Sequence, residues 1–300
     1  MSYLFNKKNN QTKYADLHVH TDKSDGKLSP EKVVAEANRA GLSAISITDH
    51  DTLDGIESAL SAGKQYNVEV IPGLELSAKN NNQEIHILGF FIDWKQRQLQ
   101  KRLYELRESR YDRALQMMEK LREMGVIIEL SDILKHTDEK YIGRPHLAAA
   151  LVKNGYADTM SEAFQRFLGN HAPAYISKGA FSPSEAIDMV LNAHGIPVLA
   201  HPGLIENEIL DKLIADGLMG IEAFYPNHSP QLTDYYCEIA KERNLLVTGG
   251  SDFHGFEDSR KTLGMMRLPY KYVEDLKAVV DEKFTKVDDD KNKFSGSLAK

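Results

Sequence analysis

Short apolar runs alternate with amphipathic segments over the first hundred residues and again after Phe181. Such runs are typical of buried strands, and a 3.6-residue apolar repeat is typical of the helices that cover them. The predicted strands are Tyr14–His20, Ala44–Thr48, Val68–Ile71, Pro197–Ala200, Gly220–Phe224, Leu245–Thr248 and Gly264–Leu268, and the first predicted helices are Pro30–Ala40 and Ile56–Gln65. This alternation predicts an α/β fold whose parallel strands are joined by helical crossovers.

Two segments depart from that alternation. Gly73–Ala78 and Glu84–Phe91 predict a hairpin around the polar turn Asn80–Gln83. From Lys95 a long helical repeat runs to Gly125, and more helix is predicted over His146–Lys153 and Ser161–Leu168. We therefore predict one α/β domain over 14–94 and 179–286, a helical insertion over 95–178 that caps the substrate, and flexible tails over 1–13 and 287–300.

The composition excludes several classes of protein. A net charge of −7 argues against a protein that coats nucleic acid, although nine Lys or Arg face four Asp or Glu between Lys95 and Arg122. That basic segment is either a solvated helix face or a surface that steers an anionic substrate. Cys237, the single cysteine, excludes an internal disulfide and a multi-thiolate zinc site. No segment has the length of a signal peptide or a membrane span, so we expect a cytoplasmic protein, and nothing implies a membrane or a stable protein partner.

Histidines and carboxylates follow most of the predicted strands. His18 and His20 lie two apart in DLHVHT, so both imidazoles project from one face of a strand. The other candidates are Asp49 and His50 in ITDHD, Glu75 in GLELSA, His86 in EIHILGF, His201 in LAHPG, and Asp252 and His254 in GGSDFHG. Barrel enzymes carry their catalytic groups at the carboxyl ends of the strands. So many polar groups at one rim need a common partner, and imidazole with carboxylate is ordinary ligation for Mn, Fe or Zn.

These motifs, in this order, resemble those of the polymerase and histidinol phosphatase (PHP) family, over about 14–94 and 180–270. The resemblance implies a distorted (β/α)7 barrel with two to three divalent metal ions, and it implies catalytic roles for His18, His20, Glu75 and Asp252. One metal would be held by His18, His20, Glu75 and Asp252, a second by Glu75, His86 and His201, and a third by Asp25, His50 and His254. Asp25 departs from the members that carry a histidine near this point, and its SDG context resembles a subgroup that has an aspartate instead. Three divalent cations among three carboxylates leave a net charge of about +3, which attracts a phosphoryl group.

Four residues outside this set are candidates for substrate binding: Arg144 and His146 in GRPH, Lys178 in YISKG, and His228 in YPNHS. GRPH resembles the insertion of the nucleotide-processing branch of the family, and an arginine can hold phosphate through two parallel hydrogen bonds. For Asp16 and Asp49 we expect a role in orienting the ligating histidines.

The resulting hypothesis is a phosphoric ester hydrolase that uses a metal-activated hydroxide on nucleoside monophosphates or 3′,5′-bisphosphates. Its alternatives are 5′–3′ trimming of a short 5′-phosphorylated oligonucleotide, histidinol-phosphate phosphatase, an amidohydrolase acting on C–N bonds, and a non-catalytic metal-binding module.

Overall fold

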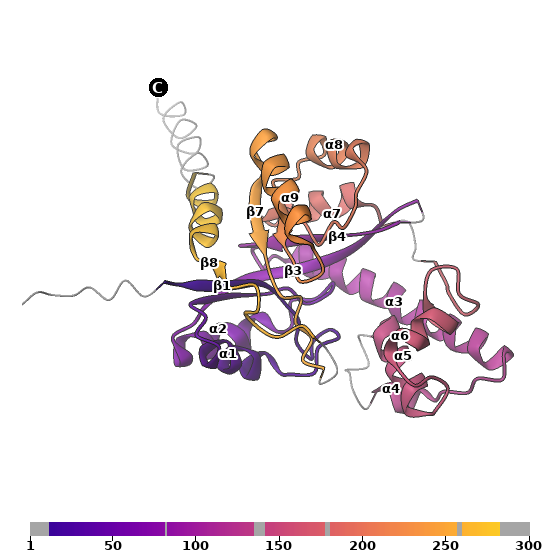
Figure 1. The fold of residues 1–300 in the computed structure, drawn as a ribbon. Coiled ribbons are helices and arrows are strands. Elements are labelled where there is room, and N and C mark those ends of the chain that lie inside the picture. The colour runs from indigo at the N-terminus through magenta and orange to yellow at the C-terminus, as the bar shows by residue number, and fades with distance from the viewer. Residues whose placement is uncertain (1–11, 82, 135–141, 178–180, 257–259, 283–300) are drawn as a thin grey trace, which may run out of the picture.

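The fold is a strongly curved sheet surrounded by helices, with a group of further helices set to one side of it (Figure 1). The computed structural model describes residues 12–81, 83–134, 142–177, 181–256 and 260–282. Its eight strands lie in the order β7-β6-β5-β4-β3-β2-β1-β8. They are β1 (Tyr14–Val19), β2 (Ala44–Ile47), β3 (Glu69–Asn80), β4 (Gln83–Phe90), β5 (Ile196–Leu199), β6 (Gly220–Phe224), β7 (Leu246–Gly249) and β8 (Leu268–Pro269). The predicted distorted α/β barrel is confirmed.

The direction of the strands changes at the centre of the sheet. β1, β2 and β3 are parallel neighbours, as are β5, β6 and β7, whereas β4 runs antiparallel to both β3 and β5. The predicted hairpin is therefore present, but its first strand is longer than expected. Val68–Ile71 and Gly73–Ala78 were predicted as separate strands, and the structure joins them in β3 because Pro72 pairs in register with Ile47 without interrupting the strand.

The barrel is nearly closed where the segment after β7 meets β1. Val19 and Phe253 form an isolated parallel bridge, and the amide of Asp252 donates to the carbonyl of His18 over 2.9 Å. Gly250 permits this approach, because a Cβ there would lie 2.3 Å from the Cβ of His18. This contact brings the last motif of the chain against the first.

Ser-Pro pairs begin three of the covering helices. The hydroxyls of Ser29, Ser182 and Ser229 accept hydrogen bonds from backbone amides in the first turn of the helix that follows. The proline after each serine is the first helical residue, where a backbone N–H would have no acceptor within the helix, so the lack of an N–H costs nothing there. The helices around the sheet are α1 (Pro30–Arg39), α2 (Ile56–Tyr66), α7 (Pro183–Asn192), α8 (Asn207–Ala215) and α9 (Pro230–Glu242).

The remaining helices surround a hydrophobic cluster of their own. They are α3 (Arg97–Glu123), α4 (Leu130–Leu134), α5 (Arg144–Lys153), α6 (Met160–Ala163) and the π-helix η1 (Phe164–Leu168), so the helix predicted over Ser161–Leu168 changes type half-way. Leu99 and Leu103 of α3 pack with the main core of the barrel, whereas Met117 and Leu121 pack with the second cluster. Thus α3 rests on both cores, and Figure 1 shows it leading from the sheet to α4, α5 and α6.

The strand predicted over Gly264–Leu268 is mostly wrong. Gly264 has φ +74°, and its amide donates to Asp16 in a turn, so only β8 pairs, antiparallel, with β1. The predicted tails lie outside the described residues except for Thr12 and Lys13. Among the described helices, none combines the length and apolar character needed to cross a bilayer.

Candidate metal centre

All nine residues expected to hold metal come together at one rim of the barrel. They arrive from β1, β3 and β4 and from the segments that follow β1, β2, β5 and β7: His18, His20, Asp25, His50, Glu75, His86, His201, Asp252 and His254. Each carboxylate among them lies within 3.8 Å of at least three of the histidines. Parallel strands that end at the same rim account for the convergence of residues more than 200 positions apart.

Glu75 lies at the centre of this set. Its Oε1 is 2.7 Å from Nδ1 of His86 and 3.0 Å from Nε2 of His201. Its Oε2 is 3.2–3.3 Å from ring nitrogens of three other histidines, namely His18, His20 and His50. The carboxylate is buried. Its two oxygens face two different groups of imidazoles, which is the arrangement that a ligand bridging two metal ions requires.

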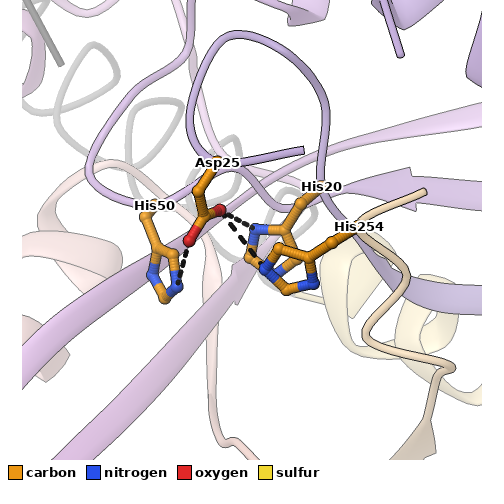
Figure 2. A group of neighbouring side chains, drawn as sticks. All are labelled: His20, Asp25, His50 and His254. Carbon is orange, nitrogen blue, oxygen red and sulfur yellow. Dashed lines mark ion pairs between the residues drawn. The ribbon is translucent and has the colours of Figure 1, made fainter. Parts of the chain in front are cut away.

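Asp25 gathers a second group of imidazoles, drawn in Figure 2. Its Oδ1 lies 3.3 Å from Nε2 of His254 and 3.6 Å from Nδ1 of His20, and its Oδ2 lies 3.8 Å from Nε2 of His50. His20 and His50 each direct their other ring nitrogen at Glu75. The resemblance separates the third site from the first two, whereas in the structure two imidazoles face both carboxylates.

Asp252 faces the histidines on one side and a tyrosine and a lysine on the other. Its Oδ1 is 3.2 Å from Nε2 of His20 and 3.6 Å from Nε2 of His18. Its Oδ2 accepts from the hydroxyl of Tyr225 over 3.1 Å and forms an ion pair with Lys261. The backbone of Asp252 has φ +51°, a conformation that costs energy for a non-glycine residue and that is often found where function requires it.

The separations between donor atoms suit a shared cation better than hydrogen bonds alone. Two donors that bind one tetrahedral ion at 2.0–2.1 Å lie about 3.3 Å apart, and many of these nitrogen–oxygen distances are 3.2–3.6 Å. Nε2 of His18 and Nε2 of His20 also face one another at 3.1 Å. Nδ1 of His20 is buried without a hydrogen-bond partner among the described residues. Imidazole and carboxylate together form a donor set that fits transition-metal ions.

The pKa values express the same mutual dependence. Burial alone would raise the pKa of Glu75, but the charges of His50, His86 and His18 hold it well below its usual value. Burial would lower the pKa of His20, but hydrogen bonds to Asp252 and Glu75 and the charge of Asp25 raise it to about 10. Burial prevails at His50 and lowers its pKa to about 3. In the absence of a cation, His18 and His20, whose pKa values are raised, neutralise carboxylates by holding protons, whereas His50 does not.

Glu222, which the sequence motifs do not indicate, supports the centre from behind. This buried carboxylate of β6 is 3.0 Å from Nδ1 of His18 and accepts the amide of His201 over 2.8 Å. The only sequence signal is an acidic residue inside the apolar run GIEAF, because a buried carboxylate requires partners. Tyr225 follows directly after the same strand, whereas nothing in the local sequence indicates Lys261.

Asp16 and Asp49 do not orient the histidine rings as expected. Asp16 accepts the amides of Ser251 and Gly264 over 2.8 and 2.7 Å, and thereby ties β1 to the loop after β7. Asp49 accepts from the amide and hydroxyl of Thr21 and from the hydroxyl of Ser24. Both carboxylates bind backbone amides or hydroxyls of neighbouring segments, so they hold the loops in place and do not orient the imidazole rings.

The four predicted substrate contacts have different surroundings. Arg144 at the start of α5 forms an ion pair with Glu84 of β4, and its guanidinium lies over the rings of Phe164 and Tyr175. Lys178 lies outside the described residues. A cavity of about 230 Å³ beside the metal centre is lined by Glu84, His86 and His201, so the partner of Arg144 faces the same space as two of the expected ligands.

The two histidines of this group make contacts within the protein. Nδ1 of His146 accepts the amide of Gly143 over 3.1 Å, which caps the start of α5. Nδ1 of His228 lies 2.9 Å from the carbonyl of Ala223, and its buried Nε2 has no hydrogen-bond partner among the described residues. Their roles in substrate binding stay predictions.

Comparison with known sequences gives the centre a context. The family model described as the PHP domain matches residues 16–193, more than half of the chain. The chain belongs to the PHP family. Three of the relatives align with the chain along most of their length. A 3′,5′-nucleoside bisphosphate phosphatase from Chromobacterium violaceum is 32% identical over 257 residues, which cover 83% of this chain and 90% of the relative.

Two further relatives of similar identity act on other phosphate esters. One is a phosphoribosyl 1,2-cyclic phosphate 1,2-diphosphodiesterase from Eggerthella lenta, 31% identical and covering 80% of this chain and 94% of its own. The other is a 5′-3′ exoribonuclease from Haemophilus influenzae, 32% identical and covering 81% of this chain and 90% of its own. Because three activities occur at 31–32% identity, overall similarity does not choose among these substrates.

A solved structure shares the architecture of this chain. It is a chain from Bifidobacterium adolescentis described as a proposed metal-dependent phosphoesterase, with a TM-score of 0.82 and 33% identity, and the match covers 89% of this chain and 96% of that chain. The barrel and the helices beside it are therefore shared by that protein.

Proposed function

We propose that this chain is a metal-dependent phosphoesterase that hydrolyses the phosphate ester of a small nucleotide, a nucleoside monophosphate or a 3′,5′-bisphosphate. The observation that carries the proposal is the position of Glu75, whose two oxygens face five imidazoles that lie in or directly after β1, β2, β4 and β5. A buried carboxylate with that environment is suited to join two cations. The three relatives described above all act on phosphate esters, which supports the same class of reaction.

The cations would be held in the groups that the family resemblance implies, although His20 and His50 each face two of the carboxylates. His18, His20, Glu75 and Asp252 would hold one ion, Glu75, His86 and His201 a second, and Asp25, His50 and His254 a third. Nitrogen and oxygen donors of this kind accept Mn, Fe or Zn, and we propose two to three ions per chain. Bound there, divalent cations supply a nucleophilic water at neutral pH and neutralise the charge of the phosphoryl oxygens.

The protein's own residues fix this donor set. Glu222 holds Nδ1 of His18, so that Nε2 of the same ring is directed at Glu75 and Asp252. Tyr225 and Lys261 hold Oδ2 of Asp252, which leaves Oδ1 toward the histidines. Glu222 adds a fourth carboxylate to the local charge, so three divalent cations would leave about +2, still attractive to a phosphate dianion.

We further propose that the helical insertion of residues 95–178 supplies substrate contacts. Arg144 reaches from α5 to Glu84 at the edge of the cavity beside His86 and His201. A phosphate entering that cavity competes with Glu84 for the guanidinium, which offers a planar pair of donors. Lys178, His146 and His228 complete the proposed set, with chemistry and recognition in different parts of the chain.

A screen of the Mn-loaded protein tests the proposal. The substrates are a nucleoside 5′-monophosphate, a nucleoside 3′,5′-bisphosphate, histidinol phosphate and a short 5′-phosphorylated oligoribonucleotide. Phosphate release is measured for each, and release of nucleoside monophosphates is measured for the oligonucleotide. We expect turnover of a small nucleotide that a chelator abolishes and that added Mn restores. Exclusive turnover of the oligonucleotide would support trimming of RNA ends instead, and metal-loaded protein without phosphatase activity would contradict the proposal.

A further inference from the structure

The loop after β5, which carries His201 to the metal centre, has a strained backbone. His201 has φ +26° and Gly203 has φ +55°, so both lie in the left-handed region. Glycine adopts that region freely, whereas for histidine it costs energy and persists only where the surrounding structure enforces it. Contacts from outside the loop are therefore needed to keep Nε2 of His201 at 3.0 Å from Oε1 of Glu75.

Two side chains from other elements hold the loop before and after this strained position. On the side of the strand, the carboxylate of Glu222 accepts the amide of His201 over 2.8 Å. On the far side, the hydroxyl of Tyr236 donates to the carbonyl of Gly203 over 2.5 Å. The amide of Ile205 is a further backbone partner of the same hydroxyl. One hydroxyl of α9 therefore joins two peptide groups of the loop.

Tyr236 is held in place for this contact by the packing of α9. Only 1% of the residue is exposed, and it belongs to the main core of the barrel. Its ring lies 5.6 Å from that of His228, which lies 5.3 Å from that of Tyr225, and Tyr225 in turn lies 5.3 Å from the imidazole of His201. This row of rings returns to His201, so α9 supports both the backbone and the imidazole of that residue.

We propose that Tyr236 is a positioning residue for the second metal ion, the ion that Glu75, His86 and His201 would hold. Its hydroxyl fixes the turn after His201 in the conformation that directs the imidazole at Glu75. The inference rests on the proposed metal centre and goes beyond it, because it gives a role in metal binding to a helix from which no ligand is proposed. Residues that orient a metal ligand in this way change metal affinity about ten- to a hundredfold.

Metal binding by variants that lack one hydroxyl tests this proposal. Tyr236→Phe keeps the buried ring and removes only the contact with the loop. Tyr235→Phe, at a residue of the same helix that is 43% exposed, is the matched control. Each full-length protein is freed of metal and titrated with Mn in competition with a fluorescent chelator. We expect Tyr236→Phe to bind one equivalent of Mn about tenfold or more weakly and to keep the others, and the control to match the wild type.

The variant His201→Ala shows whether the effect passes through the ligand. It should weaken the same equivalent of Mn, and adding Tyr236→Phe to it should weaken Mn binding no further, because no imidazole is left to position. A merely structural role of Tyr236 would instead add its own loss in the double variant and lower the affinity for every equivalent. That result, or wild-type affinity in Tyr236→Phe, would overturn the proposal.

This titration also separates the proposal from the function on which it rests. No substrate is present, so a selective loss of one equivalent supports the role of Tyr236 even if the proposed hydrolysis fails. Wild-type protein that binds less than one equivalent of Mn would contradict the metal centre itself and, with it, this inference.

Discussion

The barrel rim and the helices beside it bring charged residues together in opposite ways. At the rim, three buried carboxylates lie among six histidines, two of them buried and four half-buried, and nearly every donor has several possible partners. Beside α3, Arg110, Arg113 and Arg144 share two carboxylates, and one guanidinium nitrogen has no partner among the described residues. The rim is short of cations and the arginine cluster is short of anions. On that difference we propose a division of labour in which the rim holds metal and the insertion holds substrate.

The most severe test of this division is removal of the shared carboxylate. Glu75→Gln keeps the volume of the side chain but loses the charge that faces five imidazoles, so we expect loss of metal. Residues that only support a metal ligand change activity by up to about a hundredfold, so for a proposed ligand we expect kcat to fall by more than that. Phosphate release and elemental analysis on the same preparation measure both effects. Glu119→Gln, on the exposed surface of α3, is the matched control. Full activity in Glu75→Gln would refute the central place of this residue.

A smaller but more selective effect is expected from the insertion. Arg144→Ala should lower kcat/KM on a nucleotide about ten- to a hundredfold with metal content unchanged, because a charge-assisted pair of hydrogen bonds is lost. Arg144→Lys should recover only part of it. Glu84→Gln distinguishes substrate binding by Arg144 from a structural role of its ion pair, because it removes the ion pair with Glu84 but leaves the guanidinium in place. An equal loss in Glu84→Gln would assign Arg144 a structural role.

A substitution of Glu222 tests whether its contact with the proposed ligand His18 affects metal binding. Glu222→Gln removes the carboxylate that holds Nδ1 of His18, and we expect metal affinity about ten- to a hundredfold weaker with the fold retained. Competition with a fluorescent chelator measures the affinity. The contrasting outcome, wild-type affinity, would show that the contact between Glu222 and His18 does not tune the metal site.

The mildest expected effect is on pH dependence. Because the folded-state pKa of His20 is about 10 against an ordinary 6.5, the metal-free protein holds an extra proton between these values. This contribution to stability is fully present below pH 6.5 and is lost as the pH rises toward 10. Since metal must displace that proton, apparent affinity should rise over the same window. Titrations at several pH values check this, and a flat profile would contradict it.

The residues of the rim could be predicted from the sequence motifs because strand geometry determines where their side chains lie. Two histidines two residues apart on a strand must share a face, and groups at the ends of successive strands must converge, so eight of the nine ligand candidates could be brought together without a structure. The ninth, Asp25, came from the family resemblance. The curvature of the sheet and the reversal at β4 followed from the predicted hairpin and the family resemblance. Gly264 could not be judged in the same way, because its turn depends on a contact with Asp16, 248 residues away.

The insertion was harder to predict because long-range packing decides which of its charges are buried. Arg113 and Arg122 occupy the same helix and the same basic segment, yet one is buried among arginines and the other is exposed beside Glu119. The ion pair of Arg144 with Glu84 joins residues 60 positions apart. Glu222 was missed for a related reason, since one acidic residue in a strand names no partner.

Metal stoichiometry tests the central claim most directly, because the account depends on several cations held by one shared carboxylate. Full-length protein is freed of metal, reconstituted with Mn, Fe or Zn, separated from unbound ions and analysed for elements and protein concentration. We predict two or three equivalents of metal per chain for at least one of these ions, falling by at least one in Glu75→Gln. Less than one equivalent in the folded wild-type protein with every ion would contradict the metal centre and, with it, the proposed function.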